Sequence, residues 1–114
     1  MVFDYKREVE TVIAYGKEYP VPTMTISTYN KINEIVNRIN GSLNDVKENT
    51  QARLDGIAFF IGEDEKNRIF PSIDDVDVNE VVAFWGALKN ACDDNTTAVI
   101  KKYTPNVTIR KPND

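Results

Sequence analysis

Polar and apolar residues alternate near the N-terminus, with the two-residue period of a β-strand. Val9, Thr11, Ile13 and Tyr15 fall on one side of this segment, and Glu10, Val12 and Ala14 fall on the other. Gly16 and Lys17 then supply a turn, and the returning segment contains Pro20 and Pro22, which cannot donate hydrogen bonds to a sheet. The pattern therefore predicts a β-hairpin over about residues 9–21, with a short return strand at an edge.

The next segment carries apolar residues at helical spacing. When residues are placed about 100° apart, five apolar side chains share one arc of about 120°: Tyr29, Ile32, Ile35, Val36 and Ile39. Asparagine, glutamate and arginine fill the rest of the circle, and Asn40-Gly41 is a typical helix end. We expect an amphipathic helix over about residues 28–40.

Ser42 is placed as the N-cap of a second helix, with Asp45 at the capping-box position. One helix over about residues 43–61 explains the apolar residues that share a single face: Val46, Leu54, Ile57, Ala58 and Ile61. Phe59 lies well off that face. The polar stretch 50–53 also leaves room for a break in this helix.

The third helix has the clearest start, because Asp77 and Glu80 form a capping box. One stripe along residues 78–95 contains Val78, Val81, Val82, Trp85, Leu88 and Cys92. The expected fold is therefore α+β but mostly α: an N-terminal β-hairpin followed by three amphipathic helices. At 114 residues, 41% hydrophobic and 28% charged, the chain is typical of one globular domain. We place that domain at residues 1–103 and a mobile C-terminal tail at 104–114.

Net charge and hydropathy limit the classes of partner that we expect the chain to bind. The net charge of −4 and the pI near 4.8 argue against nucleic acid, which requires a basic surface. The longest apolar runs, residues 57–61 and 81–85, are too short to cross a membrane, so we expect a cytoplasmic protein. Residues 63–80 are strongly acidic, whereas residues 101–111 carry four positive charges and no acid. Two solvated faces explain this polarity, and so does head-to-tail self-association.

The residues that most catalysis needs are scarce. The chain has no histidine and one cysteine, so the usual general base and metal ligand are missing and Cys92 has no histidine to activate it. Asp75, Asp77 and Asn79 resemble part of a calcium loop, but Glu80 stands where that loop needs glycine. No glycine-rich phosphate loop is present. We therefore expect no enzyme activity, no cofactor and no metal.

The helices carry more apolar surface than one core contact requires. Phe59, Phe84, Ala87 and Ala91 account for the surplus. One hypothesis is that they form a protein-binding surface, with another copy or with a partner helix. The alternative is that the hairpin covers them and that Phe59 and Phe84 belong to the core.

Residues 12–26, which read VIAYGKEYPVPTMTI, lead directly into the helix that contains Tyr29 and Ile32. This segment resembles the opening of the tail assembly chaperones of long-tailed (siphovirus-type) phages and prophages of Gram-positive bacteria. In that family a hairpin around a Gly-Lys-Glu-Tyr turn precedes an amphipathic helix and a small, acidic, mostly helical domain. Residues 9–40 carry the resemblance.

The resemblance implies a non-enzymatic protein in the host cytoplasm. Such chaperones coat the tape-measure protein during tail assembly, recruit tail-tube subunits and leave before the virion matures. The expected partners are therefore the tape-measure and tail-tube proteins, or further copies of the chain in a homo-oligomer. The alternative is another phage or prophage protein, an adaptor or a head–tail connector, that also acts by binding proteins.

Overall fold

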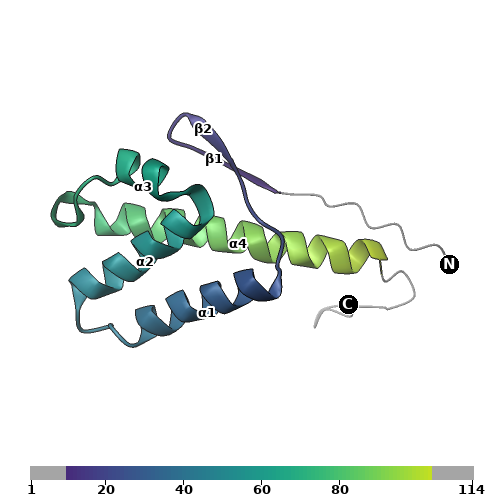
Figure 1. The fold of residues 1–114 in the computed structure, drawn as a ribbon, viewed down its shortest axis with the longest axis horizontal. Coiled ribbons are helices and arrows are strands. Elements are labelled where there is room, and N and C mark those ends of the chain that lie inside the picture. Colours follow the sequence, from purple (N-terminus) through teal and green to yellow (C-terminus); the bar gives the residue numbers. More distant parts are fainter. Residues whose placement is uncertain (1–9, 104–114) are drawn as a thin grey trace, which may run out of the picture.

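The elements follow the order hairpin, then helices (Figure 1). A computed structural model describes residues 10–103 and, within α4, the side chains as far as Asp93. The elements are β1 (Thr11–Ala14), β2 (Lys17–Pro20), α1 (Ile26–Asn40), α2 (Val46–Ile61), α3 (Glu63–Ile69), the 3-10 turn η1 (Ile73–Asp75) and α4 (Val78–Tyr103). The predicted fold class, mostly α with an N-terminal hairpin, is confirmed. The tail predicted at 104–114 lies outside the described residues.

A two-residue turn closes the hairpin. Tyr15 and Gly16 both have positive φ, 54° and 76°, which is the conformation of the type I′ turn that matches the twist of paired strands. The strands are antiparallel, with Val12 opposite Tyr19. Tyr19 and Val21 are buried and Val12 is partly buried, whereas Ile13 faces outward. The hairpin therefore presents one apolar side to the helices.

Capping residues set the starts of α1 and α2, and both differ from the prediction. Thr25 caps α1 by accepting a hydrogen bond from the Thr28 backbone N–H at 3.1 Å. Asp45, not Ser42, caps α2, because its carboxylate accepts from the Glu48 N–H at 3.1 Å. The Ser42 hydroxyl instead donates to the Arg38 carbonyl at 2.6 Å, so it ends α1. From Val46 to Ile61, α2 is continuous.

The start of α4 is as predicted, but its length is not. Asp77 accepts from the backbone N–H groups of Asn79 and Glu80 at 2.9 and 3.3 Å. The Glu80 carboxylate accepts a hydrogen bond from the Tyr15 hydroxyl at 2.6 Å. The Glu80 side chain therefore links α4 to the hairpin, a contact that the capping-box prediction did not include. The helix continues to Tyr103, beyond the predicted end near residue 95.

The strongly acidic segment 63–80 contains a helix that the prediction missed. Glu63 to Ile69 form α3, which follows α2 directly after Gly62, a residue with φ of 95°. Two ion pairs one turn apart, Lys66–Glu63 at 3.1 Å and Arg68–Glu65 at 2.8 Å, link its charged side chains. Such pairs contribute about 0.2–0.5 kcal/mol each, so most of its stability must come from contacts with the rest of the fold.

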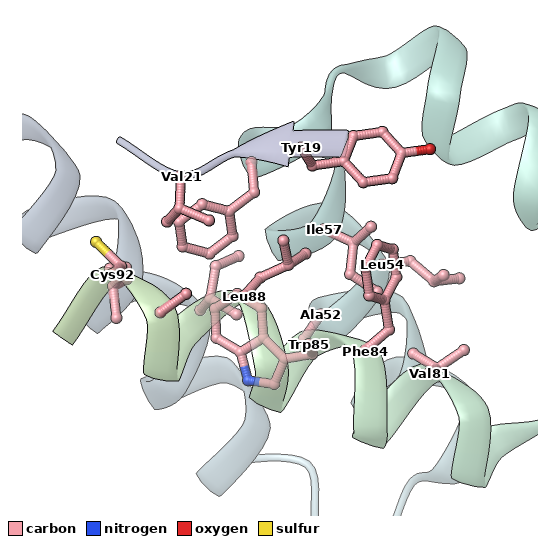
Figure 2. Close-up of a cluster of buried hydrophobic side chains, with 14 of the residues drawn as sticks. Tyr19, Val21, Ala52, Leu54, Ile57, Val81, Phe84, Trp85, Leu88 and Cys92 are labelled. Carbon is pink, nitrogen blue, oxygen red and sulfur yellow. The ribbon is translucent and has the colours of Figure 1, made fainter. Parts of the chain in front are cut away.

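The core lies where α2 and α4 meet (Figure 2). Ile57 of α2 and Leu88 of α4 are fully buried, as is Ile35 of α1. Trp85 is buried with its ring against Gly56, and its centroid lies 5.8 Å from that of Phe60. The hairpin covers this layer on one side and α1 on the other (Figure 1). Tyr29, predicted on the buried face of its helix, is exposed.

Candidate protein-binding groove

An open, largely apolar groove lies between the first turns of α2 and α4. Its volume is about 270 Å³, and its lining residues come from α2, from the η1 region and from the start of α4: Val46, Lys47, Thr50, Ile73, Asp74, Val76 and Val78. Val46 is 66% exposed and Val78 is 41% exposed. Two valines at one groove are therefore only partly removed from water.

The two caps explain why these valines stay exposed. Asp45 and Asp77 start their helices immediately before Val46 and Val78. Both valines continue the apolar stripe of their helix, but each occupies the first position, ahead of the buried residues Thr50 and Val81. The η1 turn contacts α2 and adds Ile73, and Val76 follows the turn directly; both side chains are partly buried. Helix ends and a turn thus form a hollow whose apolar walls are incompletely covered.

The two segments that form this groove are rich in acidic residues, which we call its acidic rim; of these residues Asp74 lines the hollow itself. Six acids lie within residues 45–48 and 73–80, against one lysine: Asp45, Glu48, Asp74, Asp75, Asp77 and Glu80, with Lys47. The helix N-termini and Arg38, 3.0 Å from Glu48, offset part of this charge. Lys47 lies 3.6 Å from Asp74 across the groove, with both side chains mostly exposed. Such pairs contribute about 0–1 kcal/mol, so a ligand can separate them at little cost.

A second cluster of polar groups fixes the hairpin to α3. The Tyr19 hydroxyl donates to Glu65 at 3.0 Å, and Lys17 lies 3.0 Å from the same carboxylate. Arg68 reaches the Tyr19 hydroxyl at 3.1 Å and the Tyr15 carbonyl at 3.2 Å. Hydrogen bonds from Arg68, Lys17 and Tyr19 lower the pKa of Glu65 to about 2. Each polar atom has a structural partner, so the cluster acts as a clamp.

Burial raises the pKa of the Tyr15 hydroxyl, and its hydrogen bond to Glu80 adds to the effect. The Tyr15 ring lies edge-on to Phe84, with centroids 5.1 Å apart, and edge-on to Phe70 at 6.0 Å. Tyr15 therefore stays protonated and acts as a packing and hydrogen-bonding residue at the tip of the hairpin.

The structure separates the four residues of the interface hypothesis. Phe84, 5% exposed, and Ala91 are core residues. Tyr15 and Tyr19 of the hairpin pack against the Phe84 ring. The alternative, in which the hairpin covers the apolar surplus, therefore holds for Phe84, and Ala91 is buried as well. Ala87 is exposed, and Phe59 is 40% exposed.

Phe59 and Ala87 do not share a surface. Phe59 lies one turn beyond Asp55, which bonds to Arg38 of α1 at 2.7 Å, so it is on the α1 side of α2. Ala87 lies one turn from Phe84, on the hairpin side of α4. Four residues predicted as one binding surface thus divide into two in the core and two on separate faces.

Cys92 is a core residue, as its position on the helical stripe predicts. It is fully buried, and its thiol donates to the Pro22 carbonyl at 3.2 Å. Burial raises the pKa of the thiol, with a further contribution from Asp93. The protonated thiol is therefore favoured, and a thiol in that form is a poor nucleophile.

Sequence reasoning missed the groove because it assigned Val46 and Val78 to buried faces. A signal was present, since each valine directly follows a capping aspartate and stands first in its stripe. Among the side chains that the structure describes, which end at Asp93, no three acidic or cysteine groups come together as a metal site. In the same part of the chain, no helix combines the length and the apolar composition of a membrane span.

Comparison of the chain with models of known protein families, with curated proteins and with solved structures finds no match.

Proposed function

We propose that this protein is a non-enzymatic tail assembly chaperone that acts in the host cytoplasm by binding the tape-measure and tail-tube proteins. The partial exposure of Val46 and Val78 in one open groove is the observation that carries the binding role. The segment 12–26 and its resemblance to the chaperone family carry the choice of partner.

An apolar groove of this kind suits one side of an amphipathic partner. Valine side chains contribute about 1.5–3 kcal/mol each when fully removed from water, and these two begin partly buried. A helix that places apolar residues three and four positions apart can fill the hollow between two helix starts. The acidic rim favours a partner with basic residues beside its apolar stripe.

The residues behind the groove hold its walls in place. Asp45 and Asp77 fix the helix starts through backbone hydrogen bonds, and the core between α2 and α4 holds the two helices together. The walls are therefore formed before a partner arrives, which lowers the entropic cost of binding.

Co-purification with the tape-measure protein of the same genome tests this function. The tagged full-length chain is co-expressed with that protein, as wild type and as Val46→Asp. The wild type should retain the tape-measure protein and Val46→Asp should lose most of it. Leu43→Asp is the matched control, because Leu43 is 74% exposed but does not line the groove.

Retention by Leu43→Asp and loss by Val46→Asp, with unchanged circular dichroism, would support the proposal. Equal retention by all three proteins would exclude the groove. Failure of the wild type to bind either tape-measure or tail-tube protein would exclude the chaperone role and favour the adaptor or connector alternative.

A further inference from the structure

The groove and the basic end of the chain complement each other in charge and hydropathy. We propose that the groove of one copy binds residues 107–111 of a second copy, so that copies join head to tail. Val107 and Ile109 would enter the apolar hollow, and Arg110 and Lys111 would lie against its acidic rim.

The chemistry of the segment fits the site. Val107 and Ile109 are two positions apart, and in an extended chain such residues project to the same side. They are separated by Thr108 and followed directly by two cations, with no acid between residues 101 and 111. The groove offers the matching features: apolar walls at Val46 and Val78, and a predominantly acidic rim.

The distance from the groove to the end of α4 requires that the bound segment comes from another copy. The groove lies at the Val78 end of α4, and this helix continues to Tyr103. Twenty-five steps of about 1.5 Å make a separation of about 38 Å. Ile109 is six residues beyond Tyr103, which span at most about 22 Å when fully extended. A chain cannot place Ile109 in its own groove.

Such a contact has a defined assembly consequence. Each copy offers one groove and one segment, at opposite ends of α4, so the contact joins a groove to a segment and produces closed rings, of which a reciprocal dimer is the smallest, or open chains. Because the rim attraction is between exposed charges, added salt should weaken it. A partner that occupies the groove should also displace the segment.

The inference uses the same groove as the proposed function, but does not depend on the identity of the phage partner. Its test therefore needs only this chain. Two full-length variants separate the two halves of the contact: Val46→Asp damages the groove and leaves the segment, whereas Ile109→Asp damages the segment and leaves the groove.

Sedimentation velocity is measured for each variant alone and for their equimolar mixture. Wild type should self-associate, and each variant alone should associate at least about tenfold more weakly, or 1.4 kcal/mol. The mixture should form a 1:1 complex that does not grow, because one intact groove meets one intact segment. Val78→Ser is a second groove variant, and Leu43→Asp, outside the groove, should associate as wild type does.

Three results would overturn the inference: monomeric wild type at all concentrations, association of Ile109→Asp equal to wild type, or a mixture that stays monomeric. The proposed function is judged separately, because Ile109→Asp should still retain the tape-measure protein in co-purification. Loss of self-association together with retained capture supports both proposals. Normal self-association of Ile109→Asp with retained capture rejects only this one.

Discussion

The substitution Gly56→Ala tests the closest approach in the core. An added Cβ at Gly56 would lie 2.4 Å from Cζ3, 2.8 Å from Cε3 and 3.0 Å from Cη2 of Trp85. Carbon atoms in contact prefer about 3.5–4.0 Å, so either the indole ring or α2 must move. The ring has little freedom, because Trp85 is buried and Phe60 lies beside it.

Two opposing effects set the magnitude. Replacing glycine by alanine inside a helix gains about 0.8–1 kcal/mol from helix propensity. Overpacking a core typically costs about 1–3 kcal/mol, and an approach of 2.4 Å places this site toward the upper end. We therefore expect Gly56→Ala to lower the free energy of unfolding by about 1–2 kcal/mol.

Gly86→Ala is the matched control, since Gly86 is also within a helix but an added Cβ would meet nothing within 4 Å. It should raise the free energy of unfolding by up to about 1 kcal/mol. Urea unfolding followed by circular dichroism at the helical signal measures both. Trp85→Phe removes part of the obstructing ring, so in that background the cost of Gly56→Ala should fall by about 1 kcal/mol or more.

A Gly56→Ala protein as stable as Gly86→Ala would refute the reasoning. It would mean that the indole does not lie against Gly56, and that α2 and α4 pack in another way. An unchanged cost in the Trp85→Phe background would lead to the same conclusion.

Three further outcomes follow from burial and charge. Glu65→Gln should destabilise the protein at pH 6 and lose its effect near pH 2. The lowered pKa of Glu65 gives stability that is present above about pH 4.5 and is lost as the pH falls to about 2. Urea midpoints measured between pH 2 and 6 test this dependence. Cys92, fully buried with a raised pKa, should react with a thiol reagent only after unfolding, and fast labelling of the native protein would contradict that. Phe84→Ser should lower the free energy of unfolding by about 3 kcal/mol or more, and Phe59→Ser should lower it by less than about 1.5 kcal/mol. Similar urea midpoints for the two variants would contradict this expectation.

Periodicity predicted the elements whose apolar residues repeat. The buried residues Ile32, Ile35 and Ile39 recur at helical spacing, and Tyr19 and Val21 recur at strand spacing. The missed helix α3 has no such repeat, because its sequence EDEKNRI is almost entirely charged or polar. Its position depends on the hairpin clamp at Glu65 and Arg68, a contact between residues about 50 positions apart that no local pattern contains.

The candidate site was harder to predict than the fold. A helical stripe identifies the face that can pack, but it does not show how far along the helix a neighbour extends. Val46 and Val78 continue their stripes and remain exposed, whereas Phe84 lies off the main stripe and is buried by Tyr15 and Tyr19. The outcome at each position depends on which distant element lies over it.

Photo-crosslinking tests most directly whether the groove binds the partner. Val46 is replaced by a photoreactive phenylalanine analogue in the full-length chain, which is co-expressed with the tape-measure protein. The control places the same analogue at Ile26, which is 82% exposed on the first turn of α1 and does not line the groove. We expect a crosslinked product containing the tape-measure protein from position 46 and little or none from position 26. Crosslinking from position 26 alone, or from neither position, would contradict the account.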